Sequence, residues 1–322
     1  MSRGHSRGLR TQVSPPPPSR YRWRVSGRPV TVSRVAVVLA STGRPEVLGD
    51  VLDDIAGQTR RPDWIVLSVK VDDDLPPCGV PDGVIVVYGS GISAQRNAGV
   101  AAVPDADVTF FFDDDSRVRA DYLERAVAVF EQDSRIIGLS GRVLLDGAAG
   151  AEIGTDTAVQ ALRASLTDPV DRPLEDRRTL YGCNFAYRTG ATPQRFDERL
   201  PLYSWLEDHD LARRLLREGR LVTAHQCVIV HRGVKSGGRQ AHTRLGYSQV
   251  MNPAYFVKKG SFSLWLAANE IGRRVAKNLV HSLGGRDAGW RRERLRGNRV
   301  AAADVLRGRF TPERILELEP PS

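Results

Sequence analysis

The chain has 322 residues, of which 41% are hydrophobic and 26% are charged, as in a globular protein with one large domain or two small ones. Its formal net charge of +9 is concentrated at the two ends: residues 1–34 carry eight arginines and no acid, and residues 258–310 carry thirteen Lys or Arg against four acids. No segment reaches the roughly 18 consecutive apolar residues of a membrane span, and the first residues lack the apolar stretch of a secretory signal.

The three cysteines, Cys78, Cys183 and Cys227, form no CxxC pair and are odd in number. This pattern indicates free thiols in a reducing compartment rather than a disulfide framework. We therefore expect a cytoplasmic protein.

Residues 1–34 are predicted to be a disordered basic tail, because they are rich in arginine and proline and show no hydrophobic periodicity. Beyond them, short continuous apolar runs alternate with stretches of helical periodicity. This alternation predicts an α/β domain over 35–245 with a largely parallel sheet. Strands are expected at 35–40, 64–69, 84–88 and 108–112, and helices at 46–57, 93–102 and 119–132.

The second half of the domain has a looser pattern, and 146–178 is polar without a clear periodicity. Residues 246–322 are basic and helical in character, and we expect them to form a C-terminal extension. Further strands are expected at 136–145, 179–188 and 221–233, and a helix at 203–218.

The strand expected at 108–112 runs directly into three aspartates, Asp113, Asp114 and Asp115. Adjacent carboxylates repel one another, so solvent or a cation must compensate their charge. In parallel sheets, ligands bind beyond the carboxyl ends of the strands, where these aspartates are expected. Asp113 and Asp115 point to the same side of an extended chain, and hard divalent cations such as Mg²⁺ and Mn²⁺ prefer carboxylate oxygens. The triplet is therefore either a metal site or a solvated acidic loop.

A second acidic site lies in the helix expected at 203–218. At 100° per residue, Asp208 falls in the middle of its apolar stripe, whereas Glu207 and Asp210 fall on the flanks or the far side. If the helix begins near Tyr203, Asp208 lies too deep to cap it. A lone carboxylate on a buried face is costly, so this position indicates either a functional group that faces a cleft or a buried ion pair.

A glycine motif points to a different function. Gly89, Gly91 and Ala94 have the G-x-G-x-x-A spacing of a dinucleotide fingerprint, between a strand and a helix, which predicts an NAD(P)-dependent oxidoreductase. However, a complete strand–helix–strand unit precedes the motif, and three acids follow where the fingerprint needs one. We favour a tight glycine turn without a ligand.

Six short motifs follow one another in the order VAVVLASTGRPEVL, GQTRRPDWIVLSV, GISAQRNAGV, FFFDDDSRVRADYLE, YGCNFAYR and LEDHDLARRLLREG. Through them, residues 35–235 resemble the family 2 glycosyltransferases of the GT-A fold. The resemblance implies a Rossmann-like mixed, mostly parallel sheet flanked by helices. It also implies an inverting enzyme that transfers sugar from a nucleotide-diphosphate sugar to a hydroxyl of a glycan or lipid-linked saccharide, as in polysaccharide biosynthesis, with Mn²⁺ or Mg²⁺ as cofactor. A non-catalytic nucleotide-sugar-binding protein is the alternative.

The resemblance assigns roles to residues of both acidic sites. Asp208 matches the general base, next to Glu207 in the catalytic pair. Asp113 and Asp115 match the DxD motif, with Asp115 on the metal that bridges the diphosphate. His231, after the last strand, either completes the metal site or simply ends a strand. The donor side is expected to comprise Ser41, Thr42, Arg44, Asp72, Arg96, Asp113 and Asp114, the metal site Asp113, Asp115 and His231, and the acceptor side Gly182, Cys183 and Asn184.

The C-terminal extension contains an amphipathic segment at 263–283, in which Arg273 and Lys277 fall opposite an apolar stripe. The segment is expected either to pack on the α/β domain or to lie on an anionic membrane, at its inner face and near a lipid-linked acceptor. We expect no nucleic-acid partner, because no binding motif or interleaved aromatic residues accompany the basic residues. The stripe consists of Leu264, Ala268, Ile271, Val275 and Leu279.

Overall fold

The computed structural model describes residues 31–148, 150–168, 172–234 and 241–318. Most of the predicted basic tail, residues 1–30, lies outside these ranges. Val32, which falls within the predicted tail, contacts the domain: its side chain is buried, and its backbone N–H donates a hydrogen bond to Glu131 Oε1 at 3.0 Å. Of the helices within the described ranges, none combines the length and the apolar character needed to cross a membrane.

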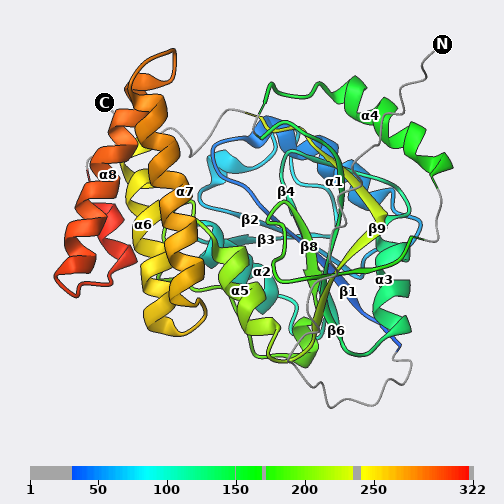
Figure 1. Ribbon diagram of the computed structural model, residues 1–322. Helices are drawn as coiled ribbons and strands as arrows, with labels where there is room; N and C mark the ends of the chain where they lie inside the picture. Colours follow the sequence, from blue (N-terminus) through cyan, green and yellow to red (C-terminus); the bar gives the residue numbers. More distant parts are fainter. Residues whose placement is uncertain (1–30, 149, 169–171, 235–240, 319–322) are drawn as a thin grey trace, which may run out of the picture.

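Within the described residues, a nine-stranded mixed sheet forms the centre of the larger domain (Figure 1). Its first half has the order β3-β2-β1-β4, with all neighbours parallel, as predicted. Ala40, the last residue of β1, pairs with Ser68 of β2 and Asp113 of β4. The carboxyl ends of these strands therefore meet at one edge. The strands are β1 (Val35–Ala40), β2 (Trp64–Val69), β3 (Val84–Tyr88) and β4 (Val108–Asp113).

The second half of the sheet joins β4 through an antiparallel strand, β8, and continues through β6 and β9, which are parallel to each other. Two short strands, β5 and β7, pair with β9 and were not predicted from the sequence. The β5 pairing sets Ser116 opposite His231, so the end of β9 lies next to the acidic triplet. The strands are β5 (Ser116–Val118), β6 (Ile136–Asp146), β7 (Glu175–Arg177), β8 (Asn184–Tyr187) and β9 (Arg220–His231).

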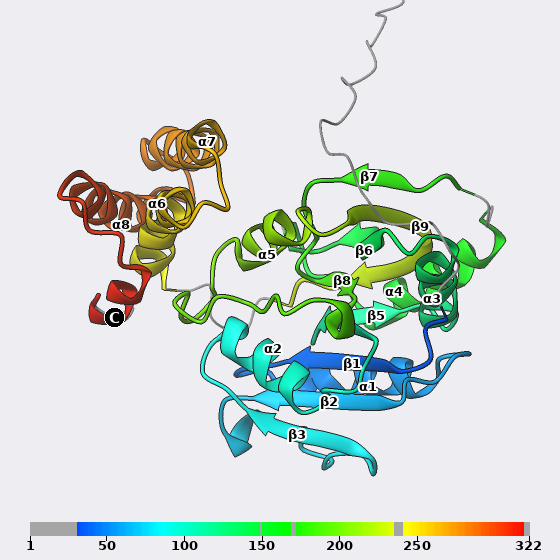
Figure 2. The ribbon, with the colours of Figure 1, turned by 90° about the horizontal axis from the view of Figure 1, so that it is seen from below.

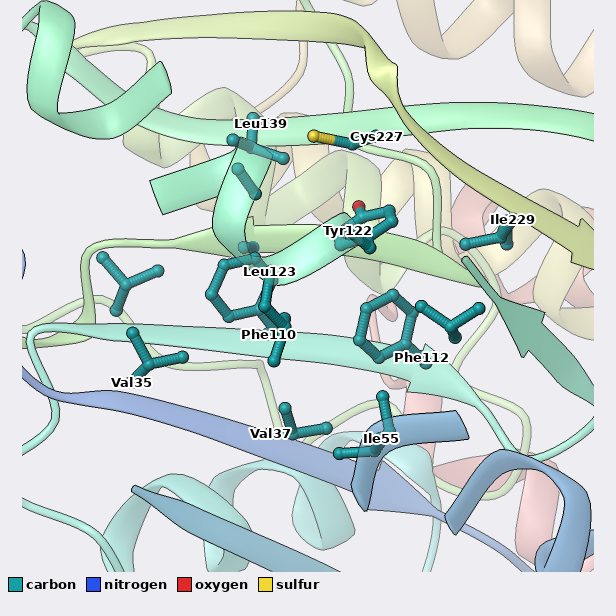
Figure 3. Close-up of a cluster of buried hydrophobic side chains, with 14 of the residues drawn as sticks. Val35, Val37, Ile55, Phe110, Phe112, Tyr122, Leu123, Leu139, Cys227 and Ile229 are labelled. Carbon is teal, nitrogen blue, oxygen red and sulfur yellow. The ribbon is translucent and has the colours of Figure 1, made fainter. Parts of the chain in front are cut away.

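Helices cover both faces of the sheet, and the three phenylalanines of β4 divide between the two cores. Phe110 and Phe112 face α1 (Leu48–Ala56) and α3 (Tyr122–Gln132), and both rings meet the Tyr122 ring edge-on, as Figure 3 shows. Phe111 faces the opposite side, where α2 (Ile92–Ala101) and α5 (Glu207–Leu215) pack. A further helix, α4 (Thr155–Ala164), packs on β9 through Ala158 and Leu162.

Three helices after the sheet form a separate bundle beside α5 (Figures 1 and 2): α6 (His242–Lys259), α7 (Leu264–Ser282) and α8 (Ala288–Leu306). Two glycines allow α6 and α8 to cross in close contact. A Cβ on Gly246 would lie 2.1 Å from the Arg294 carbonyl oxygen, and one on Gly297 would lie 2.0 Å from that of Thr243. Larger side chains at these two positions would force the helices apart.

The predicted stripe of α7 is buried only in part: Ile271 and Val275 pack against the core of the bundle, but the two ends of the stripe do not. Leu264 and Leu279 face solvent, whereas Glu270, Asn278 and Ser282 are buried. The reason is a polar layer inside the bundle, which a pattern of hydrophobic residues does not reveal. The Asn278 amide donates to Gln249 Oε1 at 2.8 Å and Asn298 Oδ1 at 3.1 Å, and its own oxygen accepts from Arg291 at 2.8 Å.

Candidate active site

The acidic triplet lies at the sheet edge where β1, β4 and β9 end, and its three carboxylates point to different partners. The Asp113 side chain is 25% exposed and lies 3.4 Å from Arg96 Nη2. Asp114 is fully enclosed, where it accepts a hydrogen bond from Ser41 Oγ at 2.7 Å and pairs with Arg44. Asp115 accepts a hydrogen bond from the Val234 N–H at 2.8 Å. Each carboxylate of the triplet thus has its own protein partner, and these partners reduce the repulsion between the three negative charges.

Asp113, Asp115 and His231 form a group suited to a metal ion. One ligand atom from each lies within 4.8 Å of the others. Among the described residues, the buried Asp115 Oδ1 makes no hydrogen bond, although it lies 3.4 Å from His231 Nε2. A buried carboxylate oxygen without a hydrogen bond is costly unless it coordinates a cation. Two carboxylates and one imidazole are suitable ligands for Mn²⁺ and also for Zn²⁺ or Fe²⁺. The residues present thus fit a divalent metal.

A hydrogen bond with Asp146 fixes the orientation of His231. His231 Nδ1 lies 2.8 Å from Asp146 Oδ1, which leaves Nε2 directed at Asp113 and Asp115. Asp146 also accepts hydrogen bonds from the Tyr181 hydroxyl and from the Ala148 N–H. This carboxylate–histidine arrangement is common around protein-bound metals. Asp146 and Tyr181 were missed because nothing in their local sequence marks them.

The charges in the cluster change the pKa values of its members. Burial alone would lower the pKa of His231, but the neighbouring carboxylates of Asp115, Asp113 and Asp146 raise it to about 9. Burial alone would raise the pKa of Asp115, but His231 and Arg44 lower it to about 2. Burial raises the pKa of Asp114 to about 7, against the opposing charge of Arg44. Without a metal, the positive charges of protonated His231 and of Arg44 compensate the negative charges of the acidic triplet.

The end of β1 is held close to this cluster. Gln95, in the first turn of α2, donates from Nε2 to the carbonyl oxygens of Ser41 at 2.7 Å and Ser68 at 3.0 Å, which ties β1 to β2. Thr42 is exposed at the tip of the loop, and Arg44 reaches back to Asp114 and Asp115. Ser41 and Arg44 therefore line the same edge as the acids.

Two acids after β2 have distinct surroundings. Asp74 is buried and accepts from the Gly43 N–H at 2.5 Å, so it fixes the loop after β1. Asp72, the residue expected on the donor side, is exposed and accepts from the Tyr88 hydroxyl at 2.6 Å. Asp74 was not singled out from the sequence, because three consecutive aspartates give no signal about which one turns inward.

Arg96 joins the acidic triplet to the second acidic site. Its guanidinium is buried between the Phe185 and Phe196 rings, with centroids at 5.3 and 5.4 Å. Nη1 donates to Glu207 Oε1 at 2.7 Å, and Nη2 donates to the Gly182 carbonyl at 2.8 Å. Burial and the neighbouring Asp208 raise the pKa of Glu207, whereas the charge of Arg96 opposes this shift.

The predicted helix around Asp208 needs correction. The helix α5 begins at Glu207, not near Tyr203, so Asp208 lies in its first turn. Glu207 and Asp210, predicted for the flanks and the far side, are both buried, whereas Asp208 is only partly buried. The cause is two partners that are distant in the sequence: Arg96 of α2 pairs with Glu207 at 2.7 Å, and Lys259 Nζ, at the end of α6, contacts Asp210 at 2.8 Å. The apolar stripe itself is buried as predicted, through Leu211, Ala212 and Leu215, but the stripe did not predict the burial of Glu207 and Asp210.

Asp208 lies beside Gly182, whose carbonyl oxygen accepts a hydrogen bond from Arg96. Its Oδ1 accepts from the His209 N–H at 2.8 Å, and a Cβ on Gly182 would lie 3.2 Å from its Oδ2. Burial raises the pKa of Asp208 to about 6, against the charge of Arg96. Gly182 thus lies beside this carboxylate, whereas the neighbouring Cys183 and Asn184 side chains are buried in the interior.

The segment before α5 has an unusual backbone. Leu202, Ser204 and Leu206 have φ values of 60°, 47° and 68°, which side-chain-bearing residues rarely adopt. Strained backbone of this kind clusters at functional sites. Gly91 packs against the segment: its φ is 92°, and a Cβ there would lie 2.8 Å from the Leu202 nitrogen. The backbone of Leu202 thus occupies the space beside Gly91. This favours a tight glycine turn over a dinucleotide-binding site of an oxidoreductase.

The sequence matches no protein-family model and no curated protein. Solved structures do resemble it. Residues 1–349 of S. aureus TarS superpose with a TM-score of 0.53 and 13% identity, covering 88% of this chain and 82% of that one. The same fragment in complex with UDP-GlcNAc superposes with a TM-score of 0.51 and 12% identity, covering 86% of this chain and 93% of that one. The chain spans 40% of the longer TarS structure. At this identity the likeness concerns the fold, which is of the GT-A type, as expected.

Proposed function

We propose that the protein is a metal-dependent, inverting glycosyltransferase that moves a sugar from a nucleotide-diphosphate sugar to a hydroxyl acceptor. The main support is one observation: in a GT-A fold, the metal-suited group Asp113, Asp115 and His231 is linked through Arg96 to the helix that bears Asp208. Asp113 and Asp115, at the end of β4, and Glu207 and Asp208, in α5, would then belong to one active site.

The donor would bind across the ends of β1 and β4. Asp113, Asp115 and His231 would hold Mn²⁺ or Mg²⁺, which supplies electrostatic stabilisation to a diphosphate leaving group. Ser41, Thr42 and Asp72 would contact the nucleoside. Arg44 and Asp114 already form a buried pair, and Arg44 could turn toward the diphosphate once a metal compensates Asp115. S. aureus TarS was solved with UDP-GlcNAc, so this donor is the first to test.

Asp208 would act as the general base. The acceptor oxygen forms a bond to the anomeric carbon while the bond from that carbon to the diphosphate breaks, and the electron pair of the broken bond leaves with the nucleoside diphosphate. Asp208 takes the hydroxyl proton. A carboxylate with a raised pKa near 6 is suited to this step, because it is ionised at neutral pH but more basic than an exposed aspartate. A single displacement inverts the anomeric configuration.

Arg96 and Glu207 would position this base rather than react. The buried ion pair holds the first turn of α5 against the Gly182 backbone, and Gly182 leaves room for the Asp208 carboxylate. The acceptor would approach past Gly182. A glycan or a lipid-linked saccharide at the surface of an anionic membrane is the acceptor class that we propose.

The test begins with ligand binding. Melting temperature is measured with UDP, GDP and their sugars, each with and without Mn²⁺, and with NAD as the control. A shift that requires both nucleotide and metal supports the proposal, whereas a shift with NAD alone contradicts it. Proton NMR of the product then reports whether the anomeric configuration is inverted.

A further inference from the structure

The outward face of α7 is apolar at both ends of the helix. Leu264 and Trp265 are 77% and 75% exposed at its start, and Leu279, Val280 and Leu283 are 53%, 63% and 79% exposed at its end. At 100° per residue, four of these five side chains lie within about 100° of one another. Small residues fill the middle of the same face: Ala268, Gly272 and Ala276.

Large exposed apolar side chains gathered on one helix face mark an interaction surface. Figure 2 shows α7 at one edge of the bundle. Its inner side contacts the strained segment before α5, since the Arg274 guanidinium lies 5.0 Å from the centroid of the Trp205 ring. The apolar face is therefore one helix layer away from the helix that bears Asp208.

Basic side chains border this face. Arg273 and Lys277 lie along one flank and are exposed, and the single acid of α7, Glu270, is buried and pairs with Arg273. At the end of the helix, Arg292 Nε donates to the Ser282 carbonyl at 3.1 Å, so this arginine lies beside Leu283. The surroundings of the apolar face are cationic.

We infer that the outward face of α7 docks on an anionic phospholipid membrane. An apolar helix face with a basic flank lies in the plane of such a surface, with tryptophan and leucine in the interfacial region and arginine and lysine near the lipid phosphates. A second copy of the chain fits less well. Twofold pairing would bring the Arg273 and Lys277 flanks of both copies together, and their like charges would repel.

This inference develops the membrane contact of the proposed function, and its test needs neither donor nor acceptor, so its failure leaves the transferase proposal standing. The full chain is sedimented with vesicles of phosphatidylcholine alone or mixed with phosphatidylglycerol. We expect binding to the mixed vesicles only, with release at high salt. The double variant Leu279→Ser with Leu283→Ser should partition about tenfold less, and Arg273→Gln with Lys277→Gln should lose the preference for phosphatidylglycerol.

Leu166→Ser is the matched control, because Leu166 is 61% exposed but lies outside the bundle. It should bind as the wild type does. Trp265→Phe should remove most of the vesicle-induced blue shift of tryptophan fluorescence. If the α7 variants bind the mixed vesicles as strongly as the wild type does, the inference is overturned. Vesicle binding would then belong to another part of the chain, for example to the arginines of residues 1–34. A dimer in sedimentation velocity that dissociates in the Leu279→Ser, Leu283→Ser variant would also overturn it.

Discussion

The guanidinium of Arg96 and the carboxylate of Glu207 form a buried ion pair, with Nη1 and Oε1 2.7 Å apart. The other nitrogen of the same guanidinium lies 3.4 Å from Asp113, at the end of β4. One side chain of α2 thus touches Asp113, at the end of β4, and Glu207, the residue before the proposed base in the first turn of α5. Arg96 therefore links the two acidic sites by direct contacts.

Removing Arg96 should destabilise the fold and inactivate the protein. Arg96→Met leaves the Glu207 carboxylate buried without its partner, which typically costs about 3–5 kcal/mol of unfolding free energy. Denaturant unfolding measures this loss. The double variant Arg96→Met with Glu207→Gln removes both charges, and it should regain most of the stability but not the activity. Equal stability of the single and double variants would contradict the assigned pairing.

Metal binding should depend on Asp115 and, less strongly, on Asp146. Asp115→Asn keeps the shape but removes a ligand charge, so Mn²⁺-dependent binding of nucleoside diphosphate should fall below detection in calorimetry. Asp146→Asn loosens only the orientation of His231 and should weaken metal affinity about 10-fold to 100-fold. Asp176→Asn, at an exposed ion pair with Arg220, is the control and should bind normally. Unchanged metal dependence in Asp115→Asn would remove the metal assignment.

Gly91 should matter for folding rather than for dinucleotide binding. Gly91→Ala is expected to lower the unfolding free energy by about 2 kcal/mol or more, because a side chain at φ 92° is strained and would also meet the Leu202 backbone. Gly79→Ala is the matched control, since its φ of 89° is similar but its surroundings are open. It should cost only the strain, about 1–2 kcal/mol. Equal losses would mean that the contact with the strained segment is unimportant.

Turnover should rise with pH through the pKa of Asp208. The carboxylate is the active form, so the logarithm of kcat/KM should increase with a slope of one below about pH 6 and level off above it. The same raised pKa affects stability with the opposite sign. Between about pH 4 and 6 the folded state holds a proton that the unfolded state has lost, so this group's contribution to the unfolding free energy falls as pH rises. A flat pH–rate profile from 5 to 7 would contradict this role.

Much of the fold could be predicted from the sequence. The parallel strands β1 to β4 are continuous apolar runs, and such runs are typical of strands buried on both faces. Their ends, and hence Asp113 and Asp115, were therefore predicted where the structure has them. The short strands β5 and β7 were missed because three residues carry too little pattern, and their formation depends on pairing with β9.

The surroundings of the base could not be predicted in the same way. Periodicity treats a helix as having one buried apolar face, but in α5 the charged residues Glu207 and Asp210 are buried as well as the apolar ones. Their burial depends on Arg96 and Lys259, which are distant in the sequence. The same holds for Asp146 and His231, which meet only through the pairing of β6 with β9.

The account rests most heavily on Asp208, and Asp208→Asn tests it directly. The amide keeps the shape of the side chain but cannot accept the acceptor's proton, and a positioned general base typically contributes about 10²-fold to 10⁴-fold in rate. Because ionised Asp208 opposes folding, the variant should melt no lower than the wild type at neutral pH. Melting temperature, donor affinity with Mn²⁺ and turnover are measured on one preparation. We predict normal melting, normal donor affinity and turnover reduced at least about a hundredfold; near-normal turnover, or a loss of turnover that follows a loss of folded protein, would contradict the account.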